Sequence, residues 1–358
     1  MGDKHLLVKK NNRAGLLTLN RPEALNALSY EMFGQLSEAL FQWQDDPEIY
    51  GVVLDSAANK VFCAGGDIRE VHERGQKDPK LAATFLCREY EYNWQLDRFT
   101  KPHISLMNGL VLGGGVGISL YGTHRVAGTN FALAMPETAI GFIPDIGASW
   151  FLGHLPYSIG LYLALTGRSI NRADAYKLGL VTHCIDEQHF SDIKRAISEG
   201  QPVDSLLDEL HKGPGKGDLP KLASWIEAVF SASTLDEIFV RAKALGEKSD
   251  GWSLRVLDEL RAKSPTSLHL AHRLWKKGRK MNLPAALQME YGVVCNLLRQ
   301  EDFYEGIRAM ILEKDKSPIW QPAAITDIST TRLEALFENN WGELNLPKRK
   351  VFGGLSSH

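Results

Sequence analysis

The chain has 358 residues, of which 44% are hydrophobic and 23% charged, and its formal net charge is −2. This composition is typical of a globular protein with one large or two modest domains. The small net charge gives no reason to expect nucleic acid or an anionic membrane as the main partner.

The four cysteines are scattered and lack the Cys-X-X-Cys spacing. This argues against a zinc site and against a dense disulfide framework, and it favours a reducing compartment. The first 15 residues lack the apolar centre of a signal peptide, and no apolar run approaches the roughly 20 residues of a membrane helix. We therefore expect a cytoplasmic protein with no membrane segment and no metal.

Strands and helices alternate in the first half of the chain. Ser29 and Asn171 are predicted helix N-caps, because each precedes a segment with helical spacing of apolar residues. Strands are predicted over 6–8, 14–19, 52–54, 103–107, 123–127 and 181–185, and helices over 30–44, 68–99 with a break at 77–79, and 172–178. This order predicts a parallel or mixed sheet covered by helices.

After Ile185 the strand signals nearly vanish. Helices are predicted over 193–211, 222–230, 235–249, 253–263, 267–277, 283–299 and 304–313. The segment 212–220 (KGPGKGDLP) is the clearest loop or hinge. We expect a core with the catalytic loops over 1–200, a helical insertion or connecting region over 201–262, and a C-terminal helical region with a tail over 263–358.

Two glycine segments are candidates for binding a carbonyl oxygen. They are Ala64-Gly65-Gly66-Asp67 and Gly113-Gly114-Gly115, the second ahead of an apolar helical segment. Two free N–H groups from separate loops can stabilise a developing oxyanion. Alternatively, the glycines only allow tight turns and close packing. The second segment does not match Gly-X-Gly-X-X-Gly, so a dinucleotide site is weakly supported.

Glu137 and Asp145 are the candidate catalytic acids. Each follows a proline, and apolar residues surround both. A carboxyl group in an apolar wall has a raised pKa, which suits general acid or base work. Alternatively, both are solvated loop acids or helix caps.

Other polar residues favour structural roles. Asp67 and Arg69 are expected to form a cap and an ion pair, and His103 is expected to be a core histidine. His269 and His272 make a weak metal pair. The basic run 273–280 is typical of a solvated face, although it is also compatible with a phosphorylated ligand.

Taken together, four segments resemble the crotonase (enoyl-CoA hydratase/isomerase) superfamily. They are LNRPEALNAL (19–28), FCAGGDI (62–68), KPHISLMNGLVLGGGVGIS (101–119) and FALAMPETAIGFIPDIGASWFL (131–152). Within the superfamily the resemblance is greatest to the 3-hydroxyisobutyryl-CoA hydrolases, through MPETAIGFIPD, KSPTSL (263–268) and DFYEGIRAMILEKDKSPIW (302–320). The resemblance implies an α/β fold, a crotonase-like spiral of ββα units followed by a helical C-terminal part.

The resemblance also implies roles for individual residues. The backbone N–H groups of Gly66 and Gly114 would form the oxyanion hole, and Glu137 and Asp145 would be catalytic. The residues that would bind substrate and coenzyme A are Leu25, Asn26, Ala27, Ala64, Asp67 and Ile68.

One departure from the superfamily pattern concerns the reaction. Hydratases carry a glutamate just after the glycine run, where this chain has Gly117. The resemblance therefore implies hydrolysis of a short 3-hydroxyacyl-CoA thioester, foremost 3-hydroxyisobutyryl-CoA of valine catabolism. An enoyl-CoA hydratase or isomerase, or a non-catalytic crotonase-like binding protein, are the alternatives. No cofactor is expected, because coenzyme A is part of the substrate, and a homo-oligomer is compatible with the superfamily.

Overall fold

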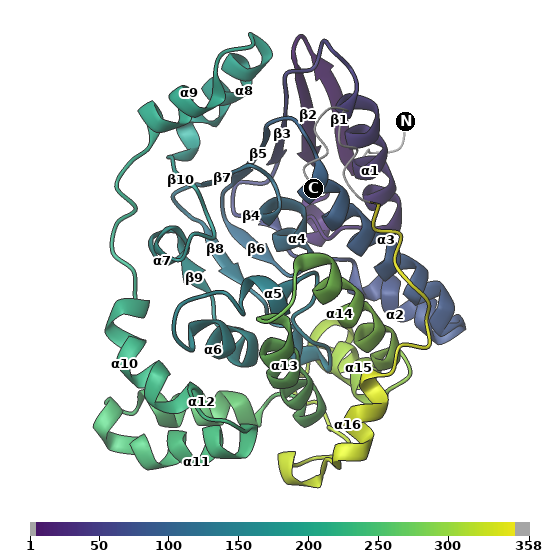
Figure 1. The fold of residues 1–358 in the computed structure, drawn as a ribbon, viewed down its shortest axis with the longest axis vertical. Helices are drawn as coiled ribbons and strands as arrows, with labels where there is room; N and C mark the ends of the chain where they lie inside the picture. The colour runs from purple at the N-terminus through teal and green to yellow at the C-terminus, as the bar shows by residue number, and fades with distance from the viewer. Residues whose placement is uncertain (1–4, 348–358) are drawn as a thin grey trace, which may run out of the picture.

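Two β-sheets form the centre of the protein in the computed structural model, which describes residues 5–347 except the side chain of Glu247 (Figure 1). Their strands are β1 (Leu6–Asn11), β2 (Ala14–Leu19), β3 (Gly51–Ser56), β4 (Val61–Cys63), β5 (His103–Met107), β6 (Leu110–Leu112), β7 (His124–Ala127), β8 (Ala132–Ala134), β9 (Ile170–Asn171) and β10 (His183–Cys184). One sheet has the order β1-β2-β3-β5-β7-β10 and the other β4-β6-β8-β9. All neighbours are parallel except β1 with β2 and β8 with β9.

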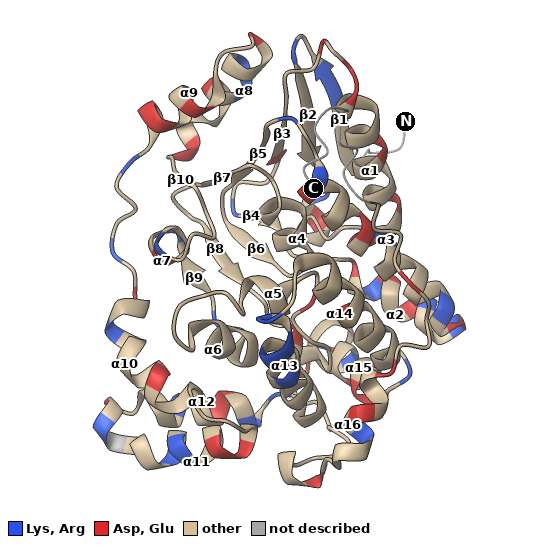
Figure 2. Ribbon diagram, in the orientation of Figure 1, with Lys and Arg blue, Asp and Glu red and all other residues tan. Residues whose placement is uncertain are grey.

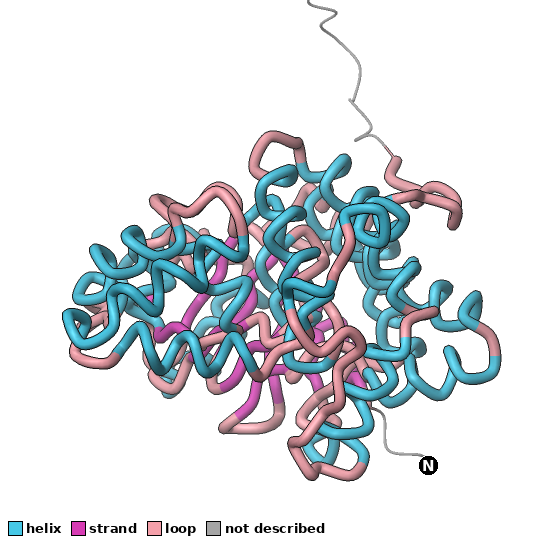
Figure 3. The backbone as a smooth tube through the Cα atoms, turned by 90° about the horizontal axis from the view of Figure 1, so that it is seen from below, coloured by secondary structure: helices cyan, strands magenta, loops and turns pink. Residues whose placement is uncertain are grey.

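Seven helices belong to the first half of the described chain. They are α1 (Tyr30–Gln44), α2 (Ile68–Lys77), α3 (Pro79–Arg98), α4 (Gly114–Leu120), α5 (Ala148–Phe151), α6 (Ile159–Thr166) and α7 (Arg172–Lys177). The chain passes from β3 to β4, from β5 to β6 and from β7 to β8, and helical segments follow each pair. This is the predicted spiral of ββα units. In the view from below, the strands lie in the middle and helices lie on either side of them (Figure 3).

The helical second half begins after β10. Its helices are α8 (Phe190–Ser198), α9 (Val203–Leu210), α10 (Leu219–Phe230), α11 (Leu235–Leu245), α12 (Trp252–Arg261), α13 (Pro265–Gly278), α14 (Leu283–Leu297), α15 (Glu301–Ile307) and α16 (Thr330–Phe337). Short 3-10 helices span Pro22–Ala24, Glu137–Ile140, Glu187–His189, Gly246–Ser249 and Ile325–Asp327, and a π-helical turn spans Arg308–Leu312. Residues 1–4, at the start of the predicted first region, and 348–358, at the end of the predicted last region, lie outside the described residues.

The smaller sheet determines where the glycine loops lie. Because β4, β6 and β8 are adjacent and parallel, their carboxyl ends meet at one edge. The segments that follow these strands are Ala64–Asp67, Gly113–Gly115 and Met135–Glu137. The ribbon of β6 and β8 carries no charged residue, as Figure 2 shows. Both glycine segments and Glu137 therefore lie at the same edge of an apolar sheet.

Predictions based on local signals are confirmed. Ser29 caps α1 by accepting a hydrogen bond from the N–H of Met32 at 3.2 Å. Asp78 ends α2 and caps α3, with Pro79 in the first turn of α3. Asn171 caps α7 with two hydrogen bonds at 3.0 Å.

Several predicted boundaries are wrong. The three-residue strands β6 and β8 and the two-residue β9 were not expected, and the predicted strand 181–185 shortens to β10. The predicted helix 193–211 is broken between α8 and α9, where Gly200 has φ +76° and Pro202 follows. The predicted loop 212–220 ends earlier, because α10 begins at Leu219; the connection runs along one side of the molecule in Figure 1.

Within residues 5–347, no helix combines the length and the apolar character needed to cross a membrane.

Replacing Ser29 with alanine is expected to lower the free energy of unfolding by about 1 kcal/mol, because the N–H of Met32 loses its acceptor. Urea denaturation measures the change. Ser37→Ala is the control, since it removes a hydroxyl from the interior of the same helix. Equal destabilisation by both substitutions would contradict the cap.

Candidate active site

The two glycine segments meet at the edge of the smaller sheet. Gly66 lies between β4 and α2, and Gly114 is the first residue of α4. A Cβ atom placed on Gly114 would lie 2.9 Å from the nitrogen of Gly66, and one placed on Gly65 would lie 3.3 Å from the nitrogen of Gly114. Two backbone amides from separate loops are therefore neighbours.

Both amides are available to a ligand. In the part of the chain that the structure describes, neither Gly66 nor Gly114 donates its N–H to another protein group. Glycine is required here, because Gly65 has φ +103° and Gly113 has φ +47°. A Cβ on Gly113 would also lie 2.7 Å from Oε1 of Glu137. The small residues thus leave room beside two free donors.

Glu137 opens its 3-10 helix beside these amides. Its side chain is 8% exposed, and Oε2 has no hydrogen-bond partner among the described residues. Burial, followed by the negative charge of Asp145, raises the pKa of Glu137 well above its usual range. A carboxyl group of this kind holds its proton to a higher pH than an exposed glutamate does, and it can act as a base or nucleophile once it is ionised.

Asp145 lies in the loop before α5 and is 5% exposed. Oδ2 accepts a hydrogen bond from the hydroxyl of Tyr90 at 2.9 Å. Burial raises the pKa of Asp145 to about 7, against the lowering effect of that hydrogen bond. The two predicted acids are thus buried and electrostatically linked, which excludes the alternative that they are solvated loop acids.

A third acid, Glu89 of α3, was missed from the sequence. It is 4% exposed, and a Cβ on Gly66 would lie 3.4 Å from its Oε2. A Cβ on Gly114 would contact its Oε1. Burial and then the charge of Asp145 raise the pKa of Glu89 well above its usual range. The available signal was its helical spacing, since Glu89 follows buried Phe85 by four residues.

Gly117 faces a closed space. A Cβ at this position would lie 2.6 Å from Nδ2 of Asn93 and 2.8 Å from Cδ1 of Ile146. Asn93 is completely buried, and neither of its amide atoms has a hydrogen-bond partner among the described residues. A side chain at the position where hydratases carry a glutamate would therefore force the side chains of Asn93 and Ile146 to move.

The predicted coenzyme A residues form a strip beside the glycine loops. The N–H of Ala64 donates to the carbonyl of Leu25 at 3.0 Å, and this bond joins the two predicted segments. Asn26 is completely buried. Its side-chain oxygen accepts a hydrogen bond from the N–H of Arg21, and its NH₂ group donates to the hydroxyl of Ser56 and to the carbonyl of Phe62. Its side chain therefore organises the strip, whereas Leu25 is half-exposed.

Asp67 supports the same strip. Its carboxylate caps α2 and forms an ion pair with the guanidinium of Arg21 at 2.6 Å. The expected pairing with Arg69 is wrong, because the guanidinium of Arg69 donates to the carbonyl of Ile311. Ile68 is the first residue of α2. A surface groove of about 630 Å³ adjoins the strip, and its lining combines three arginines with four acids: Arg21, Arg69, Arg74, Glu31, Asp67, Glu70 and Glu73.

Residues 14–337 match the protein family described as enoyl-CoA hydratase/isomerase. The chain belongs to this family. A member from Xenopus tropicalis, named 3-hydroxyisobutyryl-CoA hydrolase, mitochondrial, is 36% identical over 345 residues, which cover 94% of this chain and 89% of the relative. The human protein of the same name is 35% identical over 347 residues, with the same two coverages.

A solved structure of the enoyl-CoA hydratase/isomerase fold confirms the predicted architecture. The crystal structure of a carnitinyl-CoA dehydratase from Mycobacterium thermoresistibile matches with a TM-score of 0.91 and 32% identity, over 96% of this chain and 99% of that one. The names of the two relatives above place those proteins in mitochondria, and the cytoplasmic location expected for this chain stays a prediction.

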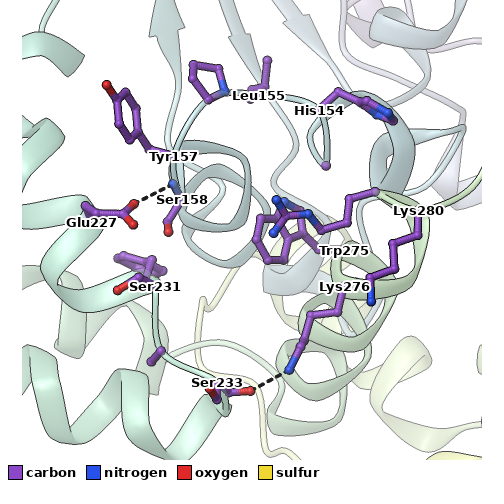
Figure 4. A pocket seen from close by; sticks show the side chains of 15 residues that line it. His154, Leu155, Tyr157, Ser158, Glu227, Ser231, Ser233, Trp275, Lys276 and Lys280 are labelled. Atoms are coloured by element: carbon purple, nitrogen blue, oxygen red, sulfur yellow. Dashed lines mark hydrogen bonds between the residues drawn. The ribbon is translucent and has the colours of Figure 1, made fainter.

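Part of the basic run 273–280 of this chain lines a separate groove of about 770 Å³ (Figure 4). Lys276 of α13 lines it together with Arg279 and Lys280, which directly follow that helix, and Figure 4 shows Lys276 donating to the carbonyl of Ser233. Arg279 stacks on Trp275 at 4.7 Å. None of the three buried acids lines this groove, so its suggested use by a phosphorylated ligand stays a prediction.

His103 and His269 do not join the site. His103 is buried, and burial lowers its pKa to about 3, as expected for a neutral core histidine. Nε2 of His269 contacts the carbonyl oxygen of Ile325 at 2.9 Å. Within residues 5–347, no group of three or more His, Cys, Asp or Glu side chains is arranged to hold a metal ion.

Replacing Asp145 with asparagine is expected to stabilise the protein at pH 8 more than at pH 5. Because its folded-state pKa is raised from 3.8 to about 7, Asp145 contributes stability below pH 3.8, and that contribution is lost as the pH rises through 7. Asparagine carries no charge into the buried site, and its side-chain oxygen can still accept the hydrogen bond from the hydroxyl of Tyr90. Urea denaturation of Asp145→Asn at both pH values measures the effect.

The control is Asp186→Asn. The ion pair with Arg172 lowers the pKa of Asp186, so this group is ionised at both pH values and its replacement should have the same effect at pH 5 and pH 8. A pH-independent effect of Asp145→Asn would contradict the buried charge.

Proposed function

We propose that this protein hydrolyses a short 3-hydroxyacyl-CoA thioester, foremost 3-hydroxyisobutyryl-CoA, to the free hydroxy acid and coenzyme A. Several curated relatives named for this activity are about as similar as the two described above. The observation that carries the proposal is the combination of two free amides and buried acids with a closed position at Gly117. On this proposal the reaction belongs to valine catabolism.

The amides of Gly66 and Gly114 bind the thioester carbonyl oxygen. Negative charge develops on this oxygen when the carbonyl carbon becomes tetrahedral, and two preorganised donors stabilise it without reorganisation. Losing one such donor typically costs about 2.7–4 kcal/mol of barrier.

Glu137 attacks the carbonyl carbon to give an acyl-enzyme anhydride, or it removes a proton from the water that attacks. In both routes the C–S bond breaks and coenzyme A leaves as a thiolate. A thiol of ordinary acidity, with a pKa of about 8.5, is a good leaving group and needs little acid help. In the anhydride route, water then hydrolyses the anhydride and regenerates the carboxylate.

Asp145 binds the hydroxyl of the acyl group and exchanges protons with water. Glu89 lies against both glycine loops, and burial followed by the charge of Asp145 raises its pKa, which favours its protonated form. A protonated carboxyl group donates a hydrogen bond, and it avoids a third negative charge beside Glu137 and Asp145.

Coenzyme A lies along the strip formed by Leu25, Asn26, Ala27, Ala64, Asp67 and Ile68. Arg21, Arg69 and Arg74 of the adjoining groove bind its phosphate groups by exchanging their present partners, which are Asp67, the carbonyl of Ile311 and Glu70. Coenzyme A enters as part of the substrate, so the mechanism uses no further cofactor.

Dehydration or hydration of an acyl-CoA is the second candidate, because the similar structure described above is named a carnitinyl-CoA dehydratase. A two-glutamate reaction of this type needs a carboxylate at position 117. Asn93 and Ile146 occupy the space into which such a side chain would grow. This crowding favours hydrolysis.

A thiol-release assay tests the proposal. The purified protein is offered 3-hydroxyisobutyryl-CoA, 3-hydroxypropionyl-CoA, acetyl-CoA and crotonyl-CoA in parallel. Thiol release from the hydroxyacyl substrates alone is expected. Loss of the crotonyl double bond without thiol release would instead support a hydratase, and coenzyme A binding without any turnover would support a binding protein.

Glu137→Gln is expected to reduce thiol release by at least a thousandfold, because the amide can neither attack the carbonyl nor accept a proton. Coenzyme A binding, measured by calorimetry, should stay within about threefold of the wild-type value. Glu23→Gln, an exposed position next to the strip, is the matched control and should keep full activity. A Glu137→Gln protein with near wild-type turnover would overturn the role of this residue.

The pH dependence of kcat/KM should show an acidic limb near pH 7. Both Asp145, whose pKa is raised to about 7, and Glu137 are held protonated by burial at lower pH, so activity rises as the pair loses a proton. In Asp145→Asn the charge that raises the pKa of Glu137 is gone, and the limb of the residual activity should move to lower pH. A profile flat between pH 5 and 8 would contradict this assignment.

A further inference from the structure

The loop that carries Asp145 is held in an unfavourable backbone conformation. Ile146 has φ +54° and Gly147 has φ +89°. A left-handed conformation is uncommon for any residue with a side chain, and it is a genuine outlier for a β-branched residue such as isoleucine. Such strain persists only where the surroundings determine the conformation.

Two side chains from distant segments fix this turn. The hydroxyl of Tyr121 donates to the carbonyl oxygen of Ile146 at 2.6 Å. Glu290 of α14 accepts hydrogen bonds from the N–H of Gly147 at 2.5 Å and from the N–H of Ser149 at 2.7 Å, one with each carboxyl oxygen. Glu290 is completely buried and lies more than 140 residues further along the chain.

We propose that Glu290 is a positioning residue, whose two hydrogen bonds to the loop 145–149 hold Asp145 where it recognises the substrate hydroxyl. This inference rests on the proposed function. The two bonds straddle Ala148, whose own N–H bonds back to the carbonyl of Asp145 at 2.9 Å. Glu290 therefore clamps the residues that follow Asp145 directly.

The chemistry of the clamp requires a side chain with two acceptor oxygens. Each oxygen of the Glu290 carboxyl group accepts one N–H, so a single side chain satisfies both backbone donors. A glutamine of the same shape has one acceptor oxygen and turns an NH₂ group toward the other amide, which leaves a buried N–H without a partner. Burial raises the pKa of Glu290 to about 8, while both amides favour the ionised form.

A second buried carboxylate provides a matched control. Asp174 of α7 is 3% exposed and accepts hydrogen bonds from the N–H groups of Asp218 at 2.8 Å and Leu219 at 3.3 Å, at the start of α10. Asp174→Asn removes the same kind of contact from a part of the fold that bears none of the site residues.

The experiment compares Glu290→Gln with Asp174→Asn in two measurements. The first is hydrogen exchange by mass spectrometry on peptides that span residues 145–150, and it does not depend on activity. The second is kcat/KM for 3-hydroxyisobutyryl-CoA relative to isobutyryl-CoA, which lacks the hydroxyl, together with the affinity for free coenzyme A.

Glu290→Gln is expected to speed exchange in the loop at least tenfold and to lower the preference for the hydroxylated substrate about 10- to 100-fold, because a misplacement of about 1 Å has effects of this size. The affinity for coenzyme A should stay within threefold. Asp174→Asn should change neither the loop exchange nor the preference, although it lowers the melting temperature.

Unchanged exchange and unchanged preference in Glu290→Gln would overturn the inference, as would an equal loss of preference in Asp174→Asn. If Glu290→Gln does not fold, the same two measurements are made on Tyr121→Phe. This substitution releases the same turn, because it deletes the hydrogen bond from the Tyr121 hydroxyl to the carbonyl of Ile146. If the wild-type protein releases no thiol from hydroxyacyl-CoA, the proposed function fails, and the exchange measurement alone decides whether the clamp exists.

Discussion

The removal of four carboxyl groups from water is the physical constraint on which the site depends. These groups belong to Glu89, Glu137, Asp145 and Glu290. For each of them burial is the main cause of a raised pKa. Ionising all four at such short range would be costly, so the protein compensates with the hydroxyl of Tyr90 and with backbone amides. The result is a group of buried acids that keep their protons to a higher pH than exposed carboxyl groups do.

The architecture satisfies this constraint with small residues. The parallel strands β4, β6 and β8 end at one edge, where glycines allow two loops and two carboxyl groups to approach one another closely. The same crowding determines what the site lacks. Because Asn93 and Ile146 fill the space at Gly117, a further carboxylate from α4 would require both side chains to move. Packing around Gly117 thus disfavours a further carboxylate.

Features that depend on neighbouring residues were predictable from the sequence. Ser29, Asp78 and Asn171 determine helix starts through local hydrogen bonds, and the family resemblance located Glu137 and Asp145. Features that depend on tertiary contacts were not. Strands β6 and β8 are too short to show a period, and Glu89 and Glu290 lie inside ordinary helical patterns. Only folding brings these helices to the glycine edge, so helical spacing can place Glu89 on a buried face but cannot assign it to the site.

The clamp on the Asp145 loop has a consequence for how the protein is made. Its acceptor, Glu290, belongs to α14, whereas the loop belongs to the first half of the chain. During synthesis the ribosome therefore releases the loop well before its acceptor, and the strained turn at Ile146 has no partner from α14 until that helix has emerged and docked. The last third of the chain completes the site, and a nascent chain that stops before α14 carries its acids in an unfinished arrangement.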